Sequence, residues 1–270
     1  MAVSTPTAED RAEPAIDLRH DPAIVSGTFE WDGPEVSTGW HRHPYHQLEY
    51  AFRGVAEVET PAGRYLVPPQ QAIWIPAGLP HVTTLREVHS ISLFLHPDVA
   101  AAPDDRARVL AAAPVVREML LHGRRWPIGR VGTDAAADRY FAVLTDLVLD
   151  WLQQEVPLHL PSTAHPLVRR ILELTDADLA AASATTVARG AGVSPRTMRR
   201  LVADHLGMSW QSYVVQSRLQ RAAAHLAGTD ATVLEVANAV GFEHPSSFTR
   251  AFRRWIGETP SAYQRRVRTA

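Results

Sequence analysis

The chain has 270 residues, which is enough for two domains of ordinary size. Apolar residues make up 46% of the sequence and charged residues 21%, a balance typical of globular proteins and not of disordered or fibrous ones. No apolar run approaches the roughly 18–20 residues that a membrane span requires, so we expect no membrane partner. The polar N-terminus lacks a signal-peptide core, which predicts a cytoplasmic protein. The absence of cysteine and lysine excludes disulfides, thiolate metal sites, cysteine nucleophiles and Schiff-base lysines.

The charge is unevenly distributed along the chain. Residues 1–162 contain 13 Arg and 21 acidic residues, a balance of −8, whereas residues 163–270 contain 14 Arg and 8 acidic residues, a balance of +6. A basic C-terminal third behind an acidic front favours a module that binds a polyanion such as nucleic acid. A chance imbalance is the alternative, because surface charge reports on partners and not on fold.

In chain order, the sequence pattern changes from strands to helices. We expect residues 1–15 to be disordered. Short alternating runs separated by glycine and proline over residues 16–100 predict an all-β sandwich or barrel. Residues 101–160 predict a helical linker or dimerisation segment, with helices over 104–121 and 134–154.

The second of these predicted helices carries an apolar stripe at helical spacing. Its members are Leu144, Leu147, Val148 and Trp151. The stripe is wide enough to contact a second copy of the chain, which predicts a homodimer. It is equally suited to packing on the chain's own barrel.

Residues 163–268 contain an internal repeat. The run V-A-x-x-A-G-V at Val187–Val193 recurs at Val236–Phe242 as V-A-x-x-V-G-F. A proline and an amphipathic pattern follow each copy, and Ser194 and Pro195 suit the N-cap and first position of a helix. Each unit is therefore a short helix, a glycine turn and a second helix, so the region predicts an all-α domain with two helix-turn-helix units.

The second helix of each unit presents polar side chains on the face opposite its apolar residues. Arginine can bind guanine edges or phosphates, and recognition helices contact DNA with their N-terminal residues. A solvated helix face is the alternative, but two copies in the same register favour DNA. The predicted DNA-contacting residues are Arg196, Thr197, Arg199, Arg200, Ser246, Ser247, Thr249 and Arg250.

These motifs closely resemble the signature of AraC/XylS-type transcription regulators. The resemblance rests on Val236–Phe242, on S-F-T-R-A-F-R at Ser247–Arg253, and on G-E-T-P-S-A-Y at Gly257–Tyr263. Gln264 departs from the family, which often has arginine at this position. The resemblance implies a long helix from Trp210 to Ala227 between the two units, and binding to two successive major grooves on one face of double-stranded DNA.

The same resemblance implies a function. Regulators of this type carry a sensing domain in front of the DNA-binding domain and act as activators or repressors. They commonly dimerise through the front region, and RNA polymerase is a further partner that such a role implies. We therefore expect a sequence-specific transcription regulator and not an enzyme.

Histidines gather in the predicted barrel. His41, His43, Gln47 and Glu49 share one parity and so one strand face, and a later turn ends in His81. These stretches resemble the two cupin motifs, which implies a metal site made by the three histidines with Gln47 in the carboxylate position and Glu49 as a substitute ligand. Such ligands suit Zn, Ni, Co, Fe or Mn. The alternative is a hydrogen-bond network without metal, around a small organic effector.

Three aromatic residues, Trp40, Tyr45 and Trp74, are candidates for an effector pocket, although core packing is the more frequent role of single aromatic residues. Two other functions remain open at this stage. One is a metal-dependent cupin enzyme fused to a DNA-binding module, and the other is an architectural DNA-binding protein with a vestigial barrel. The overall prediction is a two-domain protein, with a cupin-like all-β domain, a helical linker and a double helix-turn-helix domain.

Overall fold

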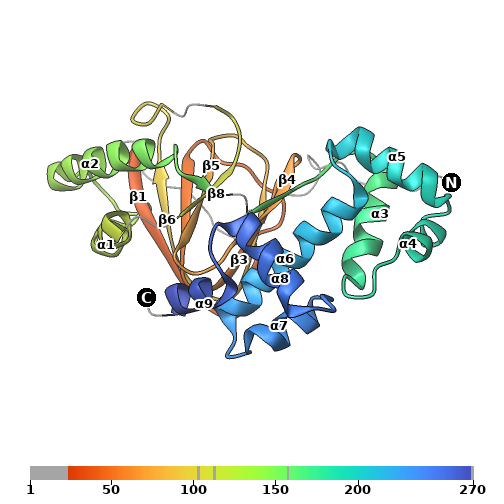
Figure 1. Cartoon of the computed structure of the whole chain (residues 1–270). Helices are drawn as coiled ribbons and strands as arrows, with labels where there is room; N and C mark the ends of the chain where they lie inside the picture. The colour runs from red at the N-terminus through yellow and green to blue at the C-terminus, as the bar shows by residue number, and fades with distance from the viewer. Residues whose placement is uncertain (1–23, 102–103, 112–113, 157, 269–270) are drawn as a thin grey trace. The chain divides into compact units, whose positions relative to one another are not determined.

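The computed structural model describes residues 24–101, 104–111, 114–156 and 158–268 (Figure 1). Residues 1–15, for which we expected disorder, lie outside these ranges. The chain divides into two compact units, of which the first contains Tyr65–Val156 and most of the chain before it, and the second contains Pro61–Arg64 and Pro157–Ala270. The boundary at residue 157 falls near the end of the predicted linker segment, residues 101–160.

The first unit is built on an antiparallel sheet with the strand order β1-β6-β3-β5-β7-β8. Strands β3 and β6 are the longest, and register shifts between Ala51 and Val55 mark a bulge that bends them. This antiparallel sheet is the predicted all-β cupin-like domain. The strands of the sheet are β1 (Ser26–Gly33), β2 (Val36–Ser37), β3 (His46–Glu59), β4 (Gly63–Val67), β5 (Gln71–Ile75), β6 (Val82–Leu95), β7 (Arg108–Ala111) and β8 (Glu155–Val156).

One predicted helix was wrong over part of its length. Residues 104–111 include strand β7, because Val109 and Leu110 are buried and pair with Ile73 and Ala72 of β5. A strand of this length contains too few alternating apolar and polar residues to be told apart, by sequence pattern, from the alanine-rich helical sequence beside it. The helix α1 begins only at Pro114 and ends at Gly123.

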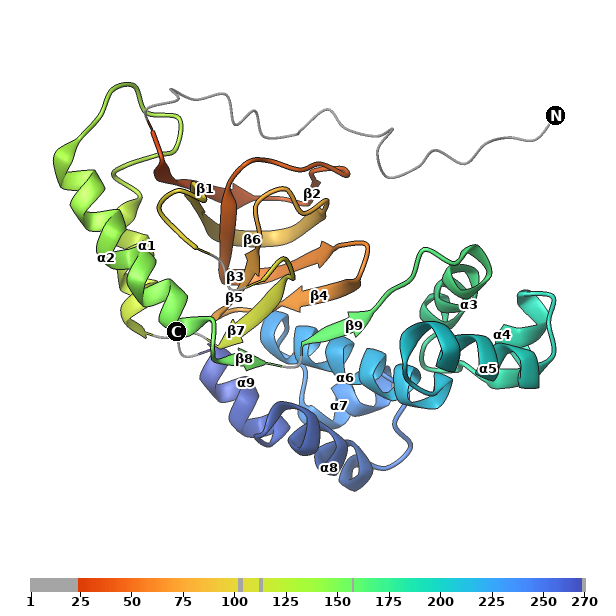
Figure 2. The ribbon, with the colours of Figure 1, turned by 90° about the horizontal axis from the view of Figure 1, so that it is seen from above.

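Two helices cover one face of the sheet. Helix α1 packs beside α2 (Ala135–Trp151), and both contact β1 or β6 (Figures 1 and 2). The Asp134 carboxylate begins α2 by accepting hydrogen bonds from two backbone N–H groups and from the Trp126 indole. The shared core contains Leu48, Trp74, Leu93, Leu120, Phe141, Leu144, Val148 and Trp151.

The apolar stripe of α2 therefore packs on its own sheet. Leu144, Val148 and Trp151 are fully buried there, and Leu147 is half-buried. Of the two alternatives for this stripe, packing on the chain's own barrel is confirmed, because the sheet already covers these side chains. The homodimer itself stays a prediction.

The second unit is helical after the short strand β9 (His159–Pro161). The long helix α6 confirms the predicted connection between the two helix-turn-helix units and contacts α5, α7, α8 and α9 (Figure 2). The helices of this unit are α3 (Pro166–Ala177), α4 (Ala184–Gly190), α5 (Pro195–Leu206), α6 (Trp210–Gly228), α7 (Val233–Ala239), α8 (Pro245–Ile256) and α9 (Pro260–Arg268). Among the described helices, none combines the length and apolar character needed to cross a bilayer.

Each repeat has its glycine in the turn between its two helices. Gly192 and Gly241 have φ of 71° and 85°, in the left-handed region that favours glycine. A Cβ on Gly241 would also lie 2.7 Å from the Ala180 Cα, whereas a Cβ on Gly192 would meet open space. The second turn is thus constrained twice, by its backbone conformation and by a close approach.

Candidate functional site

The first recognition helix, α5, presents arginines to solvent. Met198 and Val202 are fully buried, which turns Arg196, Arg199 and Arg200 to the exposed face. Within the described residues, Arg196 and Arg199 have no ion-pair partner, and Arg200 lies 3.9 Å from Asp204. These guanidinium groups are therefore available to an anionic partner such as the DNA backbone or a guanine edge.

Thr197 plays a different part from its arginine neighbours. The Ser194 hydroxyl caps α5 by accepting from the Thr197 N–H at 3.1 Å, and the two side-chain oxygens lie 2.8 Å apart. The hydroxyl of Thr197 is thus engaged at the helix start, while its exposed edge still lies on the recognition face.

The second recognition helix, α8, repeats this arrangement. Phe248 and Phe252 are fully buried in a row of aromatic rings that runs from Phe242 to Tyr263. The polar residues on the other side are Ser246 and Arg250, which are exposed, and Ser247 and Thr249, which are half-buried.

His244 was absent from the predicted DNA-contacting set. It stands at the N-cap of α8, where its exposed side chain makes no cap hydrogen bond. The repeat could have revealed it, because His244 occupies the position of Ser194 in the first unit.

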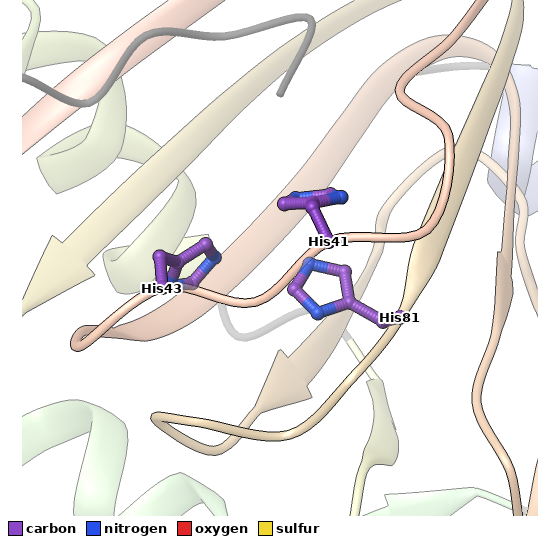
Figure 3. A group of neighbouring side chains, drawn as sticks. All are labelled: His41, His43 and His81. Atoms are coloured by element: carbon purple, nitrogen blue, oxygen red, sulfur yellow. The ribbon is translucent and has the colours of Figure 1, made fainter. Parts of the chain in front are cut away.

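In the first unit, three histidines come together. His41 and His81 exchange two backbone hydrogen bonds of 2.9 Å, which brings their ring centroids to 4.3 Å (Figure 3). The ring of His43 lies 5.8 Å from that of His41 and 5.2 Å from that of His81. One nitrogen from each ring lies within 4.8 Å of the others. The predicted three-histidine cluster is thus present in the geometry.

The backbone fixes the tautomer of each ring. The Nδ1 atoms of His41, His43 and His81 lie 3.0, 2.9 and 2.8 Å from the carbonyl oxygens of Gly39, Tyr45 and Leu79. Because a carbonyl only accepts, each Nδ1 carries a proton and donates it, which leaves a lone pair on each Nε2. This is the usual arrangement of metal-binding imidazoles, in which a carbonyl orients the ring from behind.

Burial favours the neutral form of two of these rings, His43 and His81. It lowers the pKa of His81 to about 3, and it also lowers the pKa of His43. Neutral imidazole is the form that binds a metal ion. His81 has no exposed surface, and its Nε2 has no hydrogen-bond partner among the described residues.

Gln47 and Glu49 continue the polar wall behind the histidines. The amide nitrogen of Gln47 donates to Glu49 at 3.0 Å and to Ser92 at 3.1 Å, which turns the amide oxygen toward His43 Nε2, also at 3.0 Å. Two acceptor atoms that face each other repel unless a cation or a proton lies between them. Gln47 is therefore suited to bind the same cation as the histidines.

Glu49 is placed behind this set and not within it. Its carboxyl group accepts from Gln47 and from the hydroxyl of Ser92, and burial raises its pKa. Of the predicted ligands, Glu49 thus supports Gln47 and does not join the three-histidine cluster.

A pocket of about 420 Å³, partly open to solvent, adjoins this cluster. His41, His43, Gln47 and Glu49 form part of its wall. The remaining lining residues are Phe29, Trp31, Thr38, Thr83, Leu85, Ser90, Ser92 and Phe94.

The predicted effector residues do not line this pocket. Trp74 is buried in the core and stacks on His46, and Tyr45 is buried against Phe94. Trp40 is half-buried, outside the pocket wall. Proximity along the chain thus did not place these three side chains in this pocket wall, because it does not fix which way a side chain points. The aromatic residues that do line the pocket are Phe29 and Trp31. They lie two residues apart on β1, so the alternation of side chains along a strand predicts that they share one face.

Comparison with known protein families finds one matching family model in each of the two units. A family model described as an AraC-like ligand binding domain matches residues 25–93, and one described as a helix-turn-helix domain matches residues 187–266. The chain belongs to the AraC family of transcription regulators. Its DNA-binding half and its ligand-binding half thus correspond to the two units of the fold.

Individual AraC-family relatives resemble the chain to different extents. It is 29% identical over 261 residues to the HTH-type transcriptional regulator NimR of Escherichia coli K12, covering 93% of this chain and 91% of that one. The HTH-type transcriptional regulator GlxA of Rhizobium meliloti is 34% identical over 105 residues, 38% of this chain and 32% of that one. The solved DNA-binding domain of AdpA, in complex with a target DNA, is 27% identical, with a TM-score of 0.36 over 38% of this chain and 93% of that one. The two curated relatives, NimR and GlxA, are both named as HTH-type transcriptional regulators.

Proposed function

We propose that this AraC-family regulator binds a specific DNA operator through α5 and α8, and that a divalent metal ion held in the first unit controls this binding. The observation that carries the proposal is the set of three imidazoles whose Nδ1 atoms donate to backbone carbonyls and which each place one ring nitrogen within 4.8 Å of the other two. Such a set leaves lone pairs that only a cation or a hydrogen-bond donor satisfies.

The residues that would hold the ion are His41, His43 and His81, with Gln47 as the fourth. Imidazole nitrogen with one amide oxygen suits Zn, Ni, Co, Fe or Mn. When bound, the ion supplies a compact double positive charge. The chain itself orients the ligands, since backbone carbonyls hold each ring and Glu49 and Ser92 hold the Gln47 amide.

The DNA partner is supported by the exposed faces of both recognition helices. Arg196, Arg199 and Arg200 on α5 and Arg250 on α8 are available for guanine edges or phosphates. In this proposal the regulator acts in the cytoplasm, with a second copy of the chain and RNA polymerase as its further partners.

Footprinting on the DNA upstream of the protein's own gene, with zinc and with chelator, tests the proposal. We expect protection of two adjacent major grooves on one face of the duplex, centred about 34 Å apart, and a change in the protection when zinc is removed. Protection confined to one groove would contradict the DNA-binding part. Identical footprints from protein with bound zinc and protein without it would contradict the control by metal.

A further inference from the structure

The candidate metal site supplies no negative charge of its own. His41, His43, His81 and Gln47 are neutral ligands. Among the described residues that line the pocket, Glu49 is the only carboxylic acid, and its Oε2 already accepts hydrogen bonds from Gln47 and Ser92. A divalent ion held by neutral groups in a buried site is stabilised when an anion enters beside it. The site therefore favours a negatively charged ligand.

Two buried donors in the pocket wall await an acceptor. Trp31 Nε1 and Thr83 Oγ1 are inaccessible to solvent and have no hydrogen-bond partner within the described part of the chain. An indole N–H can only donate, so an acceptor atom on the ligand is what satisfies it. Buried polar groups without partners are rare in native proteins, and a ligand explains two of them together.

The rest of the wall is apolar. Phe29, Leu85 and Phe94 lie among the lining residues. A bare inorganic anion would leave these side chains without a contact. The ligand is thus expected to carry an apolar body.

From these observations we infer that the effector of this regulator is a small organic carboxylate. Its carboxylate oxygens accept from Trp31 and Thr83 and neutralise the cation, and its apolar body lies against Phe29 and Phe94. This inference rests on the proposed metal site. It goes beyond that site because it names the chemical class of the molecule that the regulator senses.

Calorimetry on the full chain tests the inference. The protein is first titrated with zinc. The zinc-loaded protein is then titrated with benzoate, phenylacetate and pentanoate, each paired with its neutral amide of nearly the same shape. We expect at least one carboxylate to bind ten or more times more tightly than its amide, and to lose this preference when zinc is removed.

Two variants locate the carboxylate. Trp31→Phe and Thr83→Val each remove a donor while keeping most of the side-chain volume, and each should weaken carboxylate binding roughly tenfold, because a hydrogen bond to a charged group is lost. Trp40→Phe, outside the pocket wall, is the matched control and should bind as the parent does. Stoichiometric zinc binding by each variant shows that the pocket is still folded.

The outcomes separate the two proposals. If zinc binds but no carboxylate is preferred over its amide, or if Trp31→Phe and Thr83→Val bind carboxylate as the parent does, this inference is overturned and the metal site stands. If zinc does not bind at all, the metal proposal fails and the inference fails with it.

Discussion

The two units present their functional groups in opposite ways. The second unit displays charged arginines on exposed helix faces, where they meet a polyanion without any cost of burial. The first unit holds three imidazoles, of which His43 and His81 are buried, and a backbone carbonyl orients each ring. An exposed, charged surface tolerates the loss of one member, whereas a buried ligand set depends on all of its members. The two regions should therefore respond to substitution and to solution conditions in different ways.

The largest expected effect is on the buried set. His41→Ala combined with His81→Ala should lower zinc affinity more than 100-fold, because two of the ligands are removed and loss of a supporting residue alone costs about 10- to 100-fold. Elemental analysis and zinc titration of the purified protein measure this. His89→Ala is the control, since His89 pairs with Glu30 away from the cluster. Equal zinc content in the double variant and the parent would disprove the ligand assignment.

Gly192 and Gly241 occupy equivalent turns of the two repeats, so replacing each by alanine compares how much the two turns contribute to the free energy of unfolding. Gly192→Ala should cost about 1–2 kcal/mol of unfolding free energy, the price of a left-handed backbone for a residue with a Cβ. Gly241→Ala should cost more, because its Cβ also meets the backbone of Ala180 at 2.7 Å. Chemical denaturation of the full chain measures both. An equal loss in the two variants would show that the close approach at Ala180 relaxes freely.

Single arginines on the exposed surface should matter less to folding and more to DNA. Arg196→Ala, Arg200→Ala and Arg250→Ala should each cost about 1–3 kcal/mol of operator binding and relax the sequence preference at one position. Arg170→Ala on α3, whose partner is Glu173, is the control. Fluorescence anisotropy with operator DNA measures the change, and binding should weaken as salt rises. If all three variants bind as the parent does, α5 and α8 are not the recognition helices.

Acid should destabilise the metal-free first unit through its buried histidines. The pKa of His81 falls from an ordinary 6.5 to about 3 on burial, so its contribution to stability is complete above pH 6.5 and is lost as the pH falls toward 3. The pKa of Glu49 is raised by burial, so that group acts in the opposite direction.

Comparing the parent protein with His81→Asn isolates the contribution of His81 to the pH dependence of the unfolding free energy. Between pH 7 and pH 5, chelated parent protein should lose up to about 2 kcal/mol more unfolding free energy than chelated His81→Asn. Denaturant titrations at the two pH values measure the difference. Equal losses in parent and variant would mean that His81 is not a buried neutral group.

The exposed and buried faces of α5 and α8 could be predicted from the sequence, and the pocket only in part. The repeat and the helical wheel placed Arg200 and Arg250 outside and Met198 and Phe248 inside, because helical geometry alone decides which residues share a face. Strand parity likewise predicted that His41, His43 and Gln47 converge. Parity could not place Trp74 in the core or Trp31 in the pocket wall, because those depend on how distant strands pair. For the same reason the sequence alone could not decide whether Leu144 and Trp151 pack on a partner or on their own sheet, which covers them.

The central claim is that the ion in the buried set and the DNA on the exposed surface affect each other. The most direct test measures both affinities on the same full-length protein, namely DNA affinity with and without zinc, and zinc affinity with and without operator DNA. Thermodynamic linkage requires the two ratios to be equal, and a typical coupling changes each affinity roughly 5- to 150-fold. The account predicts equal ratios in this range, which disappear in the His41→Ala, His81→Ala double variant. Stoichiometric zinc binding with both ratios equal to one would contradict it.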